Sequence, residues 1–141
     1  MDTTQAERNG PSRIGGWVLL LSRLLLVWQP LNLAVAAVGA LDALALRGWP
    51  LGALLLLRLC VTGFGMAAAL ALQRLRPGAV TMAKAAVAAS ALTDLLVYST
   101  PYFPNNRAPG DTVLYAGASL AIHVIWLAYL FRSARVRNTF S

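Results

Sequence analysis

Five polar side chains inside the apolar stretches of this sequence are the residues whose types could carry chemistry. They are Gln29, Asn32, Arg58, Asp94 and His123. Arg23 and Lys84 also lie in these stretches, but within two turns of an end, where a long side chain reaches the headgroups and needs no functional role. A charged side chain among apolar residues needs a reason, because placing it unpaired in a membrane interior costs at least ~2.5–3.5 kcal/mol. Histidine adds a group that exchanges protons near neutral pH. Two hypotheses follow for these residues: a proton-linked path, or a polar network that only holds helices together.

Arg58 and Asp94 are expected to pair with each other. Each lies toward the same end of its apolar stretch, so in antiparallel helices the two side chains are at similar depth. An ion pair would remove the cost of two isolated charges in lipid, and Asp42 is a second possible partner for Arg58. Such a pair is either a structural element that fixes helix packing or part of a gated or proton-linked site.

His123 lies near the middle of the fourth apolar stretch and is the most central titratable residue. One hypothesis for it is a proton relay. The commoner arrangement is a neutral ring bonded to a neighbouring helix, here through Gln29 or Asn32. Polar bonds of this kind are ordinary contacts between membrane helices.

Pro30 is expected to disturb the first helix at mid-depth. Proline has no N–H group and clashes with the carbonyl four residues earlier, so a carbonyl near Leu26 would be freed. Residues 29–32 are therefore predicted to be the least regular backbone within the membrane, and they include two of the five polar residues.

The elements that must position these residues are four apolar stretches. Each is long enough to cross ~30 Å of hydrocarbon as a helix, which takes ~20 residues. The chain of 141 residues is 58% hydrophobic and only 12% charged, which is too apolar for a soluble protein of this size. The stretches are residues 17–41, 50–72, 79–99 and 112–131, between an N-terminal tail at 1–16 and a basic C-terminal tail at 132–141. We therefore predict an all-α, polytopic membrane protein, a compact antiparallel bundle of four transmembrane helices spanning residues 17–131.

Each stretch carries one row of small and polar residues at helical spacing. Membrane helices pack through such rows, because lipid removes the hydrophobic drive between helices. The four rows are Asn32, Ala36 and Gly39 with Gln29 alongside; Arg58, Thr62, Gly65 and Ala69; Ala83, Val87, Ser90 and Asp94; and Thr112, Ala116, Ser119 and His123. These rows are predicted to face the interior of the bundle.

The distribution of arginine predicts the orientation. The two tails and the middle connection carry Arg8, Arg13, Arg74, Arg76, Arg132, Arg135 and Arg137, whereas the other two connections carry only Arg47 and Arg107. Basic residues accumulate on the cytoplasmic side, so both termini are expected in the cytoplasm. The net charge of +7 is spread over the ends of apolar stretches, which favours lipid headgroups as partners over nucleic acid.

The basic C-terminal tail is a second candidate site. Arg132, Arg135 and Arg137 follow the fourth stretch directly, with Val136 and Phe140 on another face of the same helical period. This pattern is typical of a segment that lies on the cytoplasmic leaflet, with its apolar side down and its arginines on anionic headgroups, or that binds a partner. The alternative is a signal that only fixes topology.

Enzyme chemistry finds little support in the sequence. There is no glycine-rich phosphate loop, no carboxylate pair at hydrolase spacing and no metal-ligand cluster, so neither a metal nor a cofactor is expected. Cys60 is the one cysteine, which excludes an intramolecular disulfide. A triad can be drawn from Asp94, His123 and a serine, but nothing in the sequence fixes its geometry.

Two motifs resemble a known family. One is Ile-Gly-Gly-Trp at residues 14–17, before a leucine-rich stretch, and the other is Ser-Ala-Arg-Val-Arg-Asn-Thr-Phe at residues 133–140. Together they resemble the small bacterial inner-membrane proteins of domain-of-unknown-function family 2569. The resemblance implies four transmembrane helices over nearly the whole chain, and it implies no activity or catalytic residue.

The leading hypothesis for function is a non-enzymatic membrane protein that acts through interaction, as a homo-oligomer or as an accessory subunit of another membrane protein. A small proton-linked transporter or channel, lined by the five polar residues, is the alternative. A lipid-modifying enzyme is a more remote one.

Overall fold

The computed structural model describes residues 16–102, 111–134, 136 and 140. In these residues four helices are long and apolar enough to cross a membrane, namely Trp17–Arg47, Trp49–Gln73, Ala79–Ser99 and Asp111–Arg132. The prediction of an all-α, four-helix membrane protein is confirmed. The first span consists of α1 (Trp17–Arg23), a π-helical turn η2 (Leu24–Trp28) and α2 (Gln29–Arg47). The other three spans are α3 (Trp49–Gln73), α4 (Ala79–Ser99) and α5 (Asp111–Arg132).

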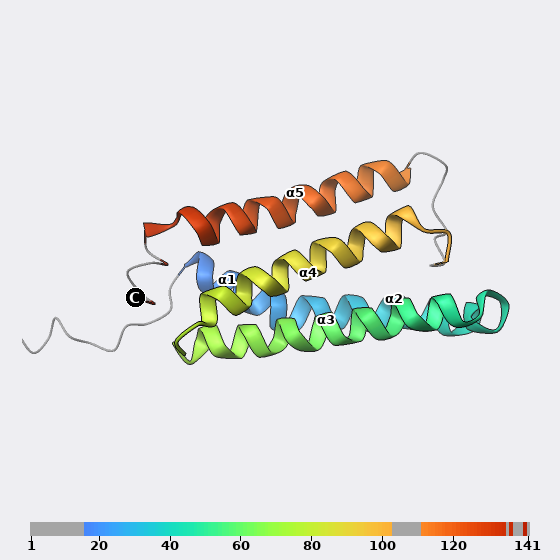
Figure 1. Cartoon of the computed structure of the whole chain (residues 1–141), viewed down its shortest axis with the longest axis horizontal. Coiled ribbons are helices and arrows are strands. Elements are labelled where there is room, and N and C mark those ends of the chain that lie inside the picture. The colour runs from blue at the N-terminus through green and yellow to red at the C-terminus, as the bar shows by residue number, and fades with distance from the viewer. Residues whose placement is uncertain (1–15, 103–110, 135, 137–139, 141) are drawn as a thin grey trace, which may run out of the picture.

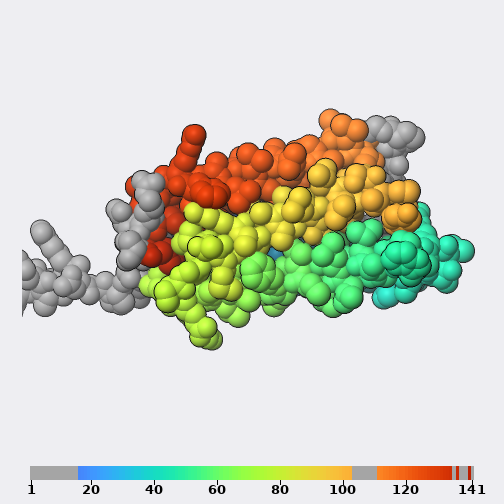
Figure 2. Space-filling model, viewed as in Figure 1, coloured from blue at the N-terminus to red at the C-terminus, as the bar shows by residue number. Residues whose placement is uncertain are grey.

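The spans run antiparallel to their neighbours in sequence, with α3, α4 and α5 side by side and the first span behind them (Figure 1). Figure 2 shows that α3, α4 and α5 together cover one face of the molecule. The first span packs on α3, α3 on α4 and α4 on α5. We call the end where α1 begins and α5 ends the tail end, and the end with Arg47 and Asp111 the loop end.

The first helix is longer than the sequence predicts. It runs for 31 residues to Arg47, whereas the apolar stretch was expected to end at residue 41. Asp42 does not stop it, because its side chain is exposed on the helix surface and needs no buried partner. The helix ends at Gly48, whose φ of 66° lies in the left-handed region that favours glycine. Arg47 Nη1 then donates a hydrogen bond of 2.6 Å to the carbonyl of Pro101, which joins two connections at the loop end.

Pro30 disturbs the helix one turn earlier than expected. The irregular backbone is the π-helical turn Leu24–Trp28, whereas residues 29–32 are α-helical. At its end the N–H of Gln29 donates to the carbonyl of Leu24, five residues back. Since Pro30 has no N–H to continue the α pattern through this turn, a wider turn just before it uses the available donors.

The row predicted to face inward is right for α4, but on α2 it is right only at the start of the helix, where Gln29 and Asn32 face the interior. On α4, Ala83, Val87 and Ser90 are buried. On α2, Gly39 is exposed, with nothing within 4 Å of a Cβ placed there, and Ala40 is fully buried instead. A π turn takes in one residue more than an α turn, so it rotates the faces that follow it relative to a straight α-helix.

The packed core lies toward the tail end. Val18, Leu21 and Leu25 of the first span meet buried side chains of α3, α4 and α5 there. Buried Ser22 accepts a 2.8 Å hydrogen bond from Gln73 Nε2, so this polar residue is satisfied inside the core.

Two apolar residues of the C-terminal tail, Val136 and Phe140, lie against this core, which corrects the expectation that these side chains face the lipid. Val136 is buried to 2% exposure within the core cluster, and Phe140 packs against the cluster. The backbone N–H of Val136 donates a hydrogen bond to Ser133 Oγ at 3.4 Å. Contact with the core removes apolar surface of the two side chains from water. Arg132 is exposed at the end of α5, and Arg135 and Arg137 lie outside the described residues.

Candidate functional site

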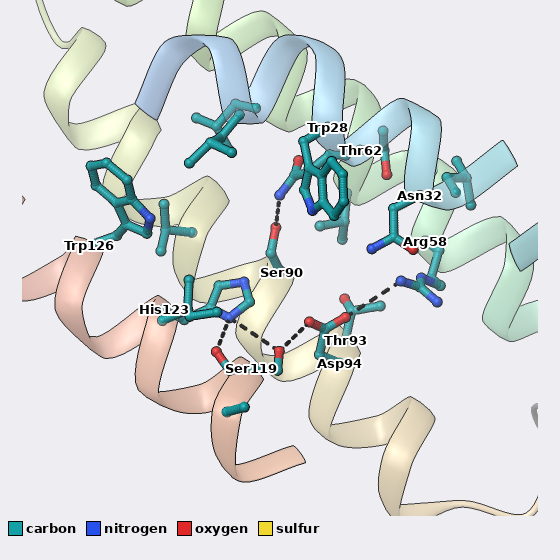
Figure 3. Close-up of a pocket in the computed structure, with 18 of the residues that line it drawn as sticks. Trp28, Asn32, Arg58, Thr62, Ser90, Thr93, Asp94, Ser119, His123 and Trp126 are labelled. Atoms are coloured by element: carbon teal, nitrogen blue, oxygen red, sulfur yellow. Dashed lines mark hydrogen bonds and ion pairs between the residues drawn. The ribbon is translucent and has the colours of Figure 1, made fainter. Parts of the chain in front are cut away.

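A cavity of about 600 Å³ lies between the first span and α5. The first span forms one wall and α5 the opposite wall, with α4 between them (Figure 3). This volume is in the range of pockets that bind small molecules. The lining residues are Leu21, Leu24, Leu25, Trp28, Gln29, Asn32, Leu33, Arg58, Val61, Thr62, Val87, Ser90, Thr93, Asp94, Tyr98, Tyr115, Ala118, Ser119, Ile122, His123 and Trp126.

The cavity opens sideways onto the surface that meets lipid. Trp28 on one wall is 58% exposed and Ile122 on the other is 55% exposed. Both residues lie near the middle of helices long enough to cross a membrane, and the first span packs on α3 whereas α5 packs on α4. We infer that the gap between the first span and α5 opens toward the hydrocarbon of the bilayer. We call this site the lateral cavity. Through this opening a molecule dissolved in the bilayer can reach the polar residues.

Gln29 lies toward the tail end of the cavity and is held by Ser90 of α4. Gln29 Nε2 donates to Ser90 Oγ at 2.8 Å, and Ser90 Oγ donates to the carbonyl of Ala86 at 2.9 Å. Because the serine uses its only proton on Ala86, it must accept from Gln29, which fixes which end of the amide is nitrogen. Gln29 Oε1 is buried without a hydrogen-bond partner among the described residues and lies against Gly65 of α3.

Arg58 and Asp94 form the ion pair that the sequence predicts. Arg58 Nη2 lies 3.6 Å from Asp94 Oδ1, and the two side chains are 16% and 26% exposed. The other carboxylate oxygen accepts a 2.6 Å hydrogen bond from Ser119 Oγ of α5. One carboxylate of α4 therefore binds α3 on one side and α5 on the other, and its charge is compensated within the protein.

His123 is bonded within its own helix, which corrects the expected bond to Gln29 or Asn32. Its Nδ1 lies 2.7 Å from the carbonyl of Ser119, one turn earlier, and 3.5 Å from Ser119 Oγ. A carbonyl can only accept, so Nδ1 carries the proton. In the neutral ring Nε2 then holds a lone pair, and it has no hydrogen-bond partner among the described residues. The ring projects from α5 into the lateral cavity (Figure 3).

The order of these bonds differs from that of a hydrolytic triad. In a triad the histidine bridges the carboxylate and the serine, and it takes the proton of the serine. Here Ser119 bridges instead, with its proton on Asp94, and His123 Nδ1 uses its proton on a backbone carbonyl. In this order the imidazole does not accept the serine proton, so the arrangement is not that of a Ser-His-Asp triad. Within the described part of the chain, no three His, Cys, Asp or Glu residues lie together as a set of metal ligands.

All five polar residues singled out in the sequence line this one cavity. Sequence reasoning missed the roles of Ser119, which connects Asp94 to His123, and of Trp28 at the opening. Ser119 had a detectable signal, since it lies four residues before His123 on the same helical face. Trp28 had none, because the π turn that sets its direction is not readable from hydropathy.

The fold and the cavity define an integral membrane protein with a polar site inside its transmembrane bundle. The chain matches no family model, and comparisons with curated proteins and with solved structures found no match. The resemblance to family 2569 therefore stays a prediction.

Proposed function

We propose that this protein is a non-enzymatic accessory protein of the bacterial inner membrane that binds a lipid-soluble molecule in the lateral cavity. The observation that carries the proposal is the convergence of five intramembrane polar residues from all four spans on one cavity. Polar side chains in lipid are costly, and a packing role alone would bury them between helices. These residues line an accessible space instead.

The order of bonds through Ser119 supports a binding role over an enzymatic one. In a triad the imidazole takes the serine proton, whereas here that proton lies on Asp94 and His123 Nδ1 carries a proton of its own. A binding site has a different requirement: its polar groups should be held in place before the ligand arrives. The bonds among Asp94, Ser119 and His123 do this.

Native mass spectrometry of the protein in nanodiscs tests the proposal. The wild-type protein should retain a bound molecule, so the measured mass of the complex should exceed the mass of the chain alone. Ala118→Trp places an indole in the cavity and should remove this molecule, whereas Ala121→Trp, on an exposed part of α5 outside the cavity, should not. Equal retention by both variants would show that the cavity is not the site. A stoichiometric foreign protein in mild detergent would identify the larger assembly that the accessory role requires.

A proton-linked transporter is the second candidate, and a specific observation favours it. Arg58, Asp94, Ser119 and His123 form a continuous polar chain across three helices. Such chains conduct protons in membrane transporters. Proton flux into liposomes that contain the protein, absent from Asp94→Asn, would favour this function over simple binding.

A further inference from the structure

We infer that the lateral cavity selects an uncharged lipid whose head carries a hydroxyl group, and that this hydroxyl donates a hydrogen bond to His123 Nε2. The inference rests on the proposed function and names its ligand class. It is argued from the opening, the charges and the acceptor that His123 presents to the cavity.

The opening requires a lipid. Trp28 and Ile122 flank it at mid-height of the bundle, where the surroundings are hydrocarbon. Most of the lining is apolar, with Leu24, Leu25 and Leu33 on the wall of the first span. Acyl or isoprenoid chains can extend along this wall and out through the opening, while the head lies among the polar residues.

The charges require a head without net charge. The one acidic side chain in the cavity, Asp94, already accepts from Arg58 and Ser119. The one cationic side chain, Arg58, is neutralised by that carboxylate. An anionic phosphate would have to compete with Asp94 for Arg58 in a low-dielectric site, and would leave one negative charge without a partner. A neutral head disturbs neither charge.

The acceptor requires a hydroxyl or N–H donor on that head. Nδ1 of His123 is committed to the carbonyl of Ser119, so the neutral ring can only accept at Nε2. The ring extends from α5 into the cavity (Figure 3). Ser90 cannot be that donor, because its proton is on the carbonyl of Ala86. A ligand hydroxyl would satisfy the nitrogen and hold the head against α5.

The test compares three lipids with identical acyl chains in the full-length protein: a 1,2-diacylglycerol, its 3-O-methyl ether and the corresponding phosphatidate. The ether replaces the hydroxyl hydrogen with a methyl group and so loses the donor, and the phosphatidate adds charge. Binding is measured by native mass spectrometry of lipid titrations. The diacylglycerol should bind about three- to tenfold more tightly than the ether, which is the range of one hydrogen bond. Phosphatidate should bind more weakly than the diacylglycerol.

The variant His123→Phe assigns the preference to this residue. It keeps a ring but removes the acceptor, so the ratio of diacylglycerol to ether affinity should fall to about one. The order of the three lipids in the wild-type protein is itself decisive if this variant does not fold. Equal binding of diacylglycerol and ether, or tighter binding of phosphatidate, overturns the inference and leaves the cavity as a lipid site. If none of the three lipids shows binding that Ala118→Trp blocks, both the inference and the proposed function are overturned.

Discussion

The side-chain oxygen of Gln29 occupies the space that a Cβ atom at position 65 would need. Gly65 lies at the point where α3 approaches the first span, and Gln29 Oε1 is the atom nearest to a Cβ built there. A Cα–H group of glycine is a weak donor to such an oxygen, which accounts for the close approach of an otherwise unpartnered acceptor. The glycine therefore lets the amide of Gln29 reach Ser90 across the bundle.

We predict that Gly65→Ala destabilises the protein by ~1–3 kcal/mol, the usual cost of overpacking a filled site. The expected displacement of Gln29 should also break its bond to Ser90. Unfolding in SDS or by heat, followed by the tryptophan signal, measures the effect. Gly63→Ala is the matched control, because nothing lies within 4 Å of a Cβ at that position on the same helix. The control should be neutral or slightly stabilising, since alanine favours a helix over glycine. A similar loss in both variants would contradict the contact.

The second prediction concerns the ion pair. Asp94→Ala strands Arg58 and removes the acceptor of Ser119, and breaking a buried pair costs ~3–5 kcal/mol. The double variant Asp94→Ala, Arg58→Leu should recover most of this loss, because no charge is left alone in lipid. Thermal unfolding of the single and double variants measures how much of the lost stability the second substitution restores. A double variant as unstable as the single one would mean that the two residues do not depend on each other.

The third prediction concerns the tail. Cys60 is exposed on the bundle, so Cys60→Ser provides a background for introduced cysteines. Val136→Cys should react slowly with a water-soluble maleimide, because that side chain is buried, whereas Ala134→Cys at an exposed position should react quickly. Adding Phe140→Ala should speed the reaction at position 136, since Phe140 packs against the same cluster. Equal rates at positions 134 and 136 would place the tail off the bundle.

The fourth prediction concerns topology. A reporter that is active only outside the cytoplasm should be silent when fused after Phe140. The same reporter inserted between residues 104 and 108, which lie outside the described residues, should be active. The reason is the excess of arginine in the two tails and the middle connection. The reverse pattern would contradict the assignment of the tail end to the cytoplasmic side.

Hydropathy predicts the four spans because lipid leaves a backbone no alternative to helix over such lengths. The pairing of Arg58 with Asp94 is predictable for a similar reason. Helical rise fixes depth, and two opposite charges at one depth in adjacent helices have a strong reason to meet. Even the convergence of the five polar residues follows, since polar groups in a bundle turn away from lipid.

Local choices among near-equal hydrogen bonds are what the sequence does not determine. His123 can bond a neighbouring helix or a carbonyl one turn back, and the choice depends on a rotamer set by packing. Which side chains of α2 face the interior depends on the backbone before Pro30. Because Pro30 has no N–H, the helix can either kink or form a π turn there, and the sequence does not determine which. The amphipathic spacing of Val136 predicts a side chain on an apolar surface, but it does not distinguish the membrane leaflet from the end of the protein's own bundle, where Val136 lies.

The serial packing of the four spans has a consequence for how the protein is made. The first span contacts α3, α3 contacts α4 and α4 contacts α5, so each new helix finds its main partner already in the membrane. Synthesis from the N-terminus can therefore build the bundle one hairpin at a time. The exception is Arg58, which enters the bilayer with α3 before Asp94 has been translated. The nascent chain must keep this arginine near the headgroups, or in contact with the insertion machinery, until α4 delivers its counter-ion.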